Sequence, residues 1–295
     1  MQRRQIFQLA SAALAASCSS RNAIHVGAKN FTEQDILGEV LAQHLHRHLN
    51  LEVGKKLHLG GSLIAHQALL SGAIDLYPEY TGTALTACLK LPIEKDPVLV
   101  FDRVRDTYST RHQVEWGWRL GFANTFAMVM RRDEAARLNI ATLSDAVARK
   151  KDWRLGFGYE FEQRADGWPS FHQTYPLQTN VGIKTMDLGL IYRALEANTV
   201  DLVAGNSTDP ALADRRFVAL ADDKLFFPPY ETCLAVRKDA LARHPDLRAA
   251  LDLLTGSISA DRMRSWNAQA ANDHKSAEAI AAEFVTRSKE NTFRP

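Results

Sequence analysis

The chain has 295 residues, of which 46% are hydrophobic and 24% are charged, as expected of a globular protein large enough for two ordinary domains. Its 36 lysines and arginines are nearly balanced by 34 aspartates and glutamates, which leaves a formal net charge of +2. Nucleic acids and anionic membranes select partners with a strong basic excess, so this balance argues against both as partners.

The N-terminus has the features of an export signal. Arg3 and Arg4 precede an apolar run from Ile6 to Ala16, and small residues then lead to Cys18. The run is too short to span a bilayer as a mature helix, and it predicts a signal peptide over residues 1–22. The residues before Cys18 resemble a bacterial lipobox, so we expect lipidation there. An ordinary Sec signal and a twin-arginine signal remain alternatives, and all three predict export to the periplasm or cell surface, with a lipid anchor as the only membrane attachment.

The first part of the mature chain alternates between strand and helix. Apolar runs predict strands at 23–27 and 51–59, and Ile74 and Leu76 begin a third. Apolar residues at helical spacing predict helices at 32–45, with Thr32 as N-cap, and at 62–70. This alternation is typical of a doubly wound α/β domain.

The rest of the chain predicts a second α/β unit inserted into the first. Helices are expected at 83–89 and 101–111, and residues 114–131 are predicted to be extended because apolar side chains alternate there. The elements expected beyond them are helices at 133–138, 144–150 and 187–197, strands at 153–157, 181–184, 200–204, 216–219 and 233–237, and a helical tail at 239–289 that packs back on the first unit. We therefore predict lobe 1 from residues 23–124 plus 231–295 and lobe 2 from residues 125–230. A cleft between two such lobes is a usual ligand site.

Residues 74–83 carry the clearest candidate binding features. A short strand breaks at Pro78 and Gly82, and the break presents Tyr80 and Thr83 at the carboxyl end of the strand. Ligands of open α/β sheets bind at these ends, and an aromatic ring beside a hydroxyl suits a ligand that is part cation and part hydrogen-bond acceptor. Tyr77 and Glu79 in the same stretch are interpreted as scaffold.

Sequence signatures of enzymes and metal sites are weak. There is no Gly-x-Ser-x-Gly, His-Glu-x-x-His or Walker sequence, and no Cys-x-x-Cys. His44 and His48 have the spacing of metal ligands on a helix, but no third ligand is evident, and a solvated helix face is the simpler interpretation. Cys88 and Cys233 are expected to be two separate buried thiols.

Several short motifs occur in a characteristic order. They are Gly27–Gln34, Tyr77–Thr83, Gly121–Phe126, Phe161–Gly167, Met186–Leu190, Ser207–Asp209 and Phe226–Tyr230. Together they resemble the substrate-binding proteins of osmoprotectant ABC importers, which capture glycine betaine, choline, carnitine and related quaternary amines. The resemblance runs from about residue 24 to about residue 270. It implies a type II periplasmic-binding-protein fold, with two α/β lobes joined by a two-stranded hinge.

The resemblance also implies a set of ligand-binding residues. In that family four tyrosines surround the trimethylammonium group, and a lysine, a threonine and an arginine hold the ligand carboxylate. The tyrosine positions fall on Tyr80, Phe126, Asn206 and Tyr230, the carboxylate positions fall on Lys29, Thr83 and Arg164, and Asn124 falls at a backbone contact near the hinge. The implied partners are a small zwitterion and an ABC permease in the inner membrane. A monomer without cofactor or catalytic residues is implied as well.

The substitutions in this set bear on the identity of the ligand. Each ring facing a quaternary ammonium contributes roughly 0.5–2 kcal/mol, and Phe126 keeps the π face of a tyrosine. Asn206 has no ring, and the loss of one wall weakens binding by about tenfold. Arg164 is expected to make a two-pronged contact with the ligand carboxylate, beside the point charge of Lys29. An acid group is therefore the better-supported half of the ligand.

Other functions stay open on sequence alone. Besides a betaine, another zwitterion such as ergothioneine or an amino-acid-like compound fits, because the amide of Asn206 could hydrogen-bond a polar ring. An exported enzyme acting on small acids, with Glu79 or Asp209 as base, is a distant alternative. A ligand-sensing domain is another.

Overall fold

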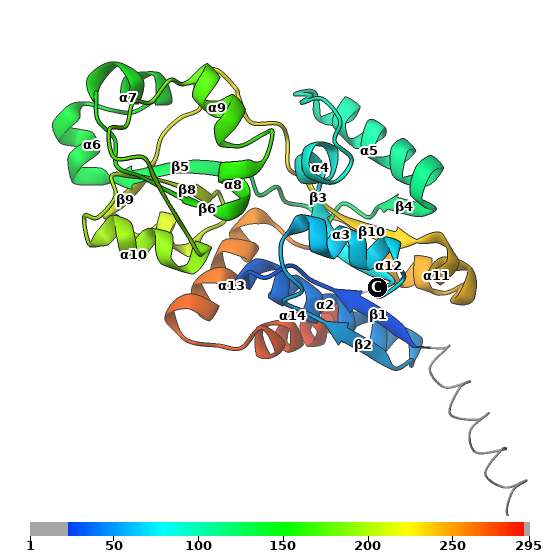
Figure 1. The fold of residues 1–295 in the computed structure, drawn as a ribbon. Coiled ribbons are helices and arrows are strands. Elements are labelled where there is room, and N and C mark those ends of the chain that lie inside the picture. The colour runs from blue at the N-terminus through cyan, green and yellow to red at the C-terminus, as the bar shows by residue number, and fades with distance from the viewer. Residues whose placement is uncertain (1–22, 292–295) are drawn as a thin grey trace, which may run out of the picture.

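The computed structural model describes residues 23–291, so the predicted signal peptide and Cys18 lie outside the described residues. The chain forms two α/β lobes, each built on a five-stranded sheet (Figure 1). The first lobe holds both ends of the described chain, and the second is made only from residues between the fourth and the last strand of the first.

In the first sheet the strands lie in the order β2-β1-β3-β10-β4. Strand β1 pairs in parallel with β2 and β3, whereas β10 runs antiparallel to both β3 and β4. The strands of this lobe are β1 (Ile24–Gly27), β2 (Val53–Lys56), β3 (Leu76–Tyr80), β4 (Val114–Gly117) and β10 (Thr232–Arg237). Its helices are α2 (Thr32–Leu49), α3 (Ser62–Leu70), α4 (Thr81–Thr83), the π-helix η1 (Ala84–Cys88), α5 (Pro97–His112), α11 (Lys238–Arg243), α12 (Leu247–Asp252), α13 (Ala260–Asn272) and α14 (Ala277–Asn291).

The second sheet repeats this arrangement, with the order β7-β6-β8-β5-β9. Strand β6 is parallel to β7 and β8, and β5 is antiparallel to β8 and β9. The strands are β5 (Phe126–Arg131), β6 (Leu155–Gly158), β7 (Ile183–Met186), β8 (Leu202–Asn206) and β9 (Phe217–Ala219). The helices are α6 (Arg132–Leu138), α7 (Leu143–Arg149), α8 (Tyr159–Gln163), α9 (Trp168–Thr174), the 3₁₀ turns η2 (Leu188–Leu190) and η3 (Pro210–Ala213), and α10 (Ile191–Glu196).

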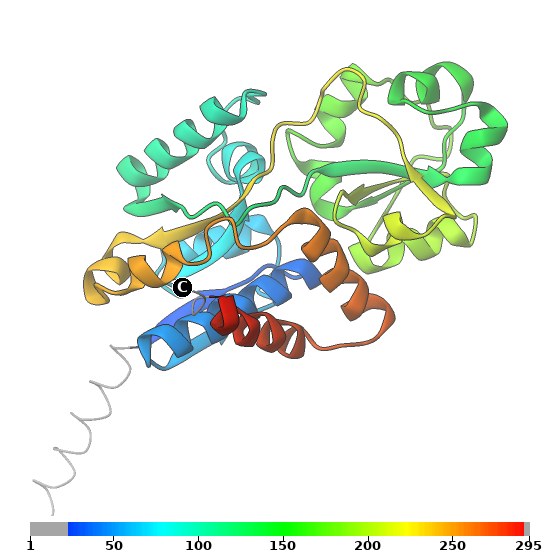
Figure 2. The ribbon, with the colours of Figure 1, turned by 180° about the vertical axis from the view of Figure 1, so that it is seen from behind.

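Two segments connect the lobes, and they run side by side (Figure 2). One leads from β4 to β5 and the other from β9 to β10, and an antiparallel bridge between Ala123 and Glu231 joins them. The single extended strand predicted for residues 114–131 is wrong, because the chain leaves the first sheet after Gly117. Trp118 has φ +50° and Gly121 has φ +112°, so neither residue has strand geometry.

Each sheet is covered on both faces by buried apolar clusters. In the first lobe one cluster joins α2 and the C-terminal helices to the sheet, as the sequence predicted for the tail, and another lies under α3 and α5. The N-cap of α2 is Phe31 rather than Thr32, because the Phe31 carbonyl already accepts from the amides of Gln34 and Asp35. Cys88 and Cys233, the cysteines of the described part of the chain, are unpaired thiols; Cys233 is buried, but Cys88 is partly exposed.

Candidate ligand-binding site between the lobes

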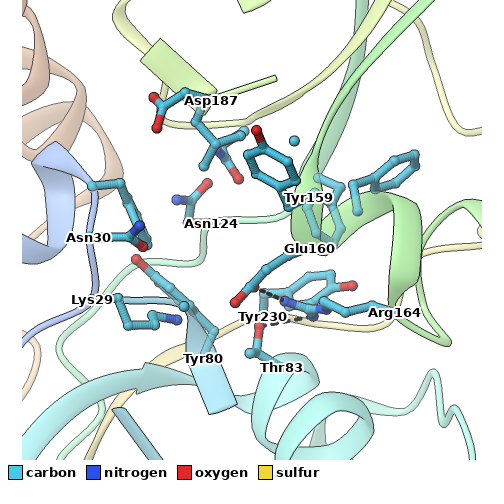
Figure 3. A pocket seen from close by; sticks show the side chains of 17 residues that line it. Lys29, Asn30, Tyr80, Thr83, Asn124, Tyr159, Glu160, Arg164, Asp187 and Tyr230 are labelled. Carbon is cyan, nitrogen blue, oxygen red and sulfur yellow. Dashed lines mark hydrogen bonds and ion pairs between the residues drawn. The ribbon is translucent and has the colours of Figure 1, made fainter. Parts of the chain in front are cut away.

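A cavity of about 290 Å³ lies between the two sheets (Figure 3). Its walls are formed where parallel strands of both sheets reach their carboxyl ends, which is the usual location of ligands in open α/β sheets. All eight ligand-binding residues predicted from sequence line this one cavity: Lys29, Tyr80, Thr83, Asn124, Phe126, Arg164, Asn206 and Tyr230. The structure thus brings together side chains that are up to about 200 residues apart in the chain.

The local fold explains how these side chains meet. Lys29 follows β1, Tyr80 is the last residue of β3, and Thr83 lies in the turn after it. In the second lobe Phe126 and Asn206 are directly opposite each other in the β5–β8 pair. Gly82 permits the close approach of the crossover segment, because a Cβ at this position would lie 2.7 Å from the ring of Tyr230.

Arg164 is the centre of a buried ionic cluster. Its Nε and Nη2 donate to the two carboxylate oxygens of Asp166 at 2.9 and 2.6 Å, and Nη2 also donates to the Thr83 hydroxyl at 3.1 Å. Burial alone would raise the pKa of Asp166, but the guanidinium holds that pKa below its ordinary value. The Nε–Nη2 edge of the Arg164 guanidinium is therefore occupied by Asp166. Nη1 donates to Glu160, so the expected two-pronged contact with a ligand carboxylate stays a prediction and requires Arg164 to release one of these two carboxylates.

Glu160 closes this cluster from the second lobe. Its carboxylate accepts from Arg164 Nη1 at 3.2 Å and, across the cleft, from the backbone amide and hydroxyl of Ser62 at 2.5 and 3.0 Å. Burial acts to raise the pKa of Glu160, but the nearby cations Arg164 and Lys29 lower it below its ordinary value. With the Arg164–Thr83 bond, these contacts join the lobes at one end of the cavity.

Lys29 and Tyr80 form a second buried pair. The Lys29 Nζ lies 2.5 Å from a carboxylate oxygen of Glu79 and 4.5 Å from the centroid of the Tyr80 ring. Glu79 is fully buried, as is Tyr77, which confirms the interpretation of both as scaffold. One face of the Tyr80 ring is thus already covered by a protein cation.

Aromatic side chains form much of the remaining wall. Phe126 meets Tyr230 edge to face at a centroid distance of 5.7 Å and Phe161 at 4.9 Å. Phe31 and Tyr159, which the sequence argument did not select, also line the cavity. These rings supply aromatic surface that Asn206 lacks, and Phe31 was detectable because it lies within the first of the ordered motifs.

The buried carboxylate of Glu33 ties the site to both lobes. Oε1 accepts from the Tyr80 hydroxyl at 2.6 Å and from Asn124 Nδ2 at 3.0 Å. Oε2 accepts from the Thr208 hydroxyl at 2.5 Å and from Asn267 Nδ2 at 3.1 Å. The backbone amide of Asn124 meanwhile donates to the Tyr230 carbonyl at 3.0 Å. Tyr80 and Asn124 are therefore held in place by one buried carboxylate, Glu33, which was not predicted from the sequence.

The charge balance of the cavity favours a cation. Lys29 and Arg164 are each neutralised by a buried carboxylate, Glu79 and Asp166, and Glu160 adds a further negative charge on the wall. The excess carboxylate stabilises a cationic group in the cavity. This electrostatic result strengthens the quaternary-amine half of the predicted ligand, which sequence alone had made the weaker half.

The histidine pair on α2 does not form a metal site. His44 is buried with Nε2 2.8 Å from the Ala250 carbonyl, and burial lowers the pKa of His44 to about 4, whereas His48 is exposed. The solvated helix face predicted for this pair is thus wrong for His44. Within residues 23–291, no cluster of three or more histidine, cysteine, aspartate or glutamate side chains has the arrangement to hold a metal ion.

Two α/β lobes, one inserted into the other, with a small cavity between them are typical of solute-binding proteins, and comparison with known proteins agrees. Over residues 22–287 the chain matches the family described as the substrate binding domain of ABC-type glycine betaine transport systems. It is 33% identical over 273 residues to the carnitine transport binding protein OpuCC of Listeria monocytogenes (strain 10403S), covering 91% of this chain and 88% of that protein.

Two further similarities are informative. The chain is 29% identical to the ergothioneine transport permease/ergothioneine binding protein EgtU of Helicobacter pylori (strain G27), covering 90% of this chain and 49% of that protein. A crystal structure described as a glycine betaine/carnitine/choline ABC transporter superposes with a TM-score of 0.75 at 29% identity, covering 90% of this chain and 98% of the other.

The chain therefore belongs to the family of substrate-binding domains of ABC-type glycine betaine transport systems. Its type II periplasmic-binding-protein fold and its function as a substrate-binding protein of an ABC importer are confirmed. The family is extracytoplasmic, binds small quaternary amines and works with ABC permeases, and the relatives are transport binding proteins. Within the part of the chain that the structure describes, no helix has the length and apolar character needed to cross a membrane.

Proposed function

We propose that this protein captures a small zwitterion with a quaternary ammonium group and a carboxylate, of the glycine betaine type, and delivers it to an ABC permease. The observation that carries the proposal is one cavity in which three aromatic rings, Tyr80, Phe126 and Tyr230, lie beside the Arg164–Thr83 pair. Pockets for drug-sized ligands usually have volumes of about 300–1,000 Å³. The volume of this cavity, about 290 Å³, lies just below that range and suits a smaller ligand.

Each end of such a ligand has a place in this cavity. The methylated ammonium faces the rings of Tyr80, Phe126 and Tyr230, where cation–π attraction and the excess negative charge act together. The carboxylate lies beside the Thr83 hydroxyl and the Arg164 guanidinium, where it competes with Glu160 for Nη1, with Lys29 as the nearby point charge. Asn124 lines the cavity at the crossover, with its side chain already held by Glu33. Closure would move the lobe of residues 125–230 against the lobe of residues 23–124 plus 231–295.

A betaine with a polar ring, such as ergothioneine, is the second candidate. Asn206 supports it, because an amide on the cavity wall can hydrogen-bond a heterocycle whereas a tyrosine ring would pack against a methylated head. The similarity to the ergothioneine-binding relative points to the same ligand class. We do not propose an enzyme, because Glu79, a candidate base, is fully buried and paired with Lys29.

We further infer that the protein is exported, that Cys18 carries a lipid anchor, and that the monomer docks on its permease. The leader sequence supports the first two inferences, since small residues run into Cys18 after an apolar segment. Mass spectrometry of the membrane-bound protein tests them: a diacylated N-terminal peptide beginning at Cys18 is expected, and an unmodified N-terminus beyond that residue would contradict the anchor.

Calorimetry on ligand-free protein tests the proposed ligand class. Glycine betaine should bind, choline should bind more weakly because it lacks the carboxylate, and Arg164→Ala should reduce glycine betaine affinity at least tenfold. Arg132→Ala, an arginine in the second lobe that lies outside the cavity, is the matched control. If Arg164→Ala binds as tightly as the Arg132→Ala control, or if betaine is consumed during the titration, the proposed function is wrong.

A further inference from the structure

Tyr159 is the most exposed aromatic residue on the wall of the ligand cavity. It is the first residue of α8, and it lines the cavity although it is 60% exposed. In Figure 3 its ring lies on the side of the cavity away from Lys29 and Tyr80. A ring that lines the cavity and is also open to solvent lies at the mouth of the cavity, where a bound ligand can cover it.

The strand register places Tyr159 next to the wall position that lacks a ring. Strands β6 and β8 are parallel, with Leu155 opposite Leu202. The same register, continued to the strand ends, brings Tyr159 level with Asn206, the last residue of β8. On its other side Asn206 is opposite Phe126. The short amide therefore lies between two aromatic residues, and the Tyr159 ring can cover the part of the wall that the amide leaves open.

The faces of the Tyr159 ring are free, unlike those of two other rings in the cavity. Lys29 Nζ lies 4.5 Å from the centroid of Tyr80, and Arg164 Cζ lies 5.1 Å from the centroid of Phe126. Among residues 23–291, no cation or ring lies against Tyr159, and its hydroxyl has no hydrogen-bond partner. Tyr159 therefore offers a ligand cation a π face for which no protein cation competes.

A carboxylate lies level with the same ring. Strand β6 also pairs in parallel with β7, with Gly158 opposite Met186, so the register brings Tyr159 level with Asp187. Asp187 lines the cavity and accepts from the backbone amide of Gly189 at 2.9 Å, but it forms no ion pair within the described part of the chain. A cation beside Tyr159 is thus attracted by the ring and by this carboxylate together.

The backbone at Tyr159 is held in place on both sides. Phe161 is buried and meets Phe157 at a centroid distance of 4.9 Å, which fixes α8 on the second lobe. Glu160 accepts from the backbone amide and hydroxyl of Ser62, which fixes the start of α8 to the first lobe. Only the Tyr159 side chain must then become ordered when a ligand binds, and this small loss of freedom favours affinity.

We propose that Tyr159 is a specificity-determining residue, whose ring covers the ammonium group of the bound ligand where Asn206 supplies no ring. Its π face distinguishes a methylated cation from a neutral group of the same shape. This inference rests on the proposed function, because Arg164 and Thr83 hold the carboxylate of the same ligand.

Two substitutions at this position separate the π face from apolar contact. They are compared by calorimetry with whichever of glycine betaine and ergothioneine the wild type binds more tightly. Tyr159→Phe keeps the ring and should bind within threefold of the wild type. Tyr159→Leu keeps an apolar side chain without a π face and should bind about tenfold more weakly than Tyr159→Phe. Both variants should unfold at the wild-type temperature, because the side chain is mostly exposed.

A third protein tests the cation–π contact without a change of shape. It carries 3,4,5-trifluorophenylalanine in place of Tyr159, which weakens the negative potential of the ring face, and it should bind at least threefold more weakly than Tyr159→Phe. Equal affinity of Tyr159→Leu and Tyr159→Phe, or of the fluorinated protein and Tyr159→Phe, would overturn the inference and leave the proposed function intact. A wild type that binds no quaternary-ammonium zwitterion would overturn both.

Discussion

Replacement of Glu33 by glutamine tests whether one buried carboxylate organises the site. The side chain is 3% exposed and accepts four hydrogen bonds, two on each oxygen. Glutamine keeps the shape but replaces one oxygen by an NH₂ group, so two of the four donors then face another donor. Hydroxyls such as those of Tyr80 and Thr208 can rotate to accept instead, whereas the amides of Asn124 and Asn267 cannot without flipping.

The magnitude follows from these contacts. Hydrogen bonds to a charged group contribute about 1.5–3 kcal/mol each, and a buried donor left without an acceptor costs about 1–3 kcal/mol. With one amide donor orphaned and the charge removed, Glu33→Gln should lower the free energy of unfolding by about 3 kcal/mol. Ligand affinity should fall as well, because the amides of Asn124, on the cavity wall, and Asn267 can no longer both donate to residue 33.

Urea unfolding and calorimetry of the same preparations provide the measurement. Glu39→Gln is the matched control, since it lies on the same helix and is 6% exposed but pairs with a half-exposed lysine, Lys55. That pair is of the kind that contributes about 1 kcal/mol or less. Equal losses of unfolding free energy in Glu33→Gln and Glu39→Gln would refute the role assigned to Glu33.

Two further predictions concern individual groups. Tyr80→Phe removes the hydroxyl that donates to Glu33 but keeps the ring. Urea unfolding should show a free energy of unfolding lower by about 1–2 kcal/mol, while ligand affinity changes less than about threefold. A much larger loss of affinity would mean that the hydroxyl itself binds ligand. Burial raises the pKa of Asp209 to about 6, so the folded state holds the proton more tightly than the unfolded state, and stability should fall as pH rises from about 4 through about 6. Asp209→Asn should remove this loss of stability. The free energy of unfolding is measured in urea at pH 4.5 and 7.5 for the wild-type protein and the variant, and an equal change with pH in both would contradict the assignment.

The sequence was informative about features that are local or that recur in short motifs. Strand and helix alternation, the return of the C-terminal tail and the side chains around the cavity follow from apolar spacing and from motifs such as Gly27–Gln34. The connection between the lobes was harder, because alternation of apolar residues continues through Trp118 and Gly121 although their φ angles are positive. Backbone geometry at such points depends on the surrounding fold.

Partnerships over long sequence distances could not be predicted. The four donors around Glu33 come from Tyr80, Asn124, Thr208 and Asn267, which belong to both lobes and to the C-terminal helix α13. No local pattern marks that carboxylate as buried. Asp166 lies two residues after Arg164 in the sequence, but only the folded turn between them shows that its carboxylate accepts from both Nε and Nη2 of the guanidinium.

Native mass spectrometry of the protein isolated from cells that produce it tests the central claim most directly. We expect a co-purified small molecule whose fragments identify a quaternary-ammonium carboxylic acid, with greatly reduced occupancy in Arg164→Ala and unchanged occupancy in Arg132→Ala. A bound molecule without a quaternary ammonium group, or equal occupancy in both variants, would contradict it.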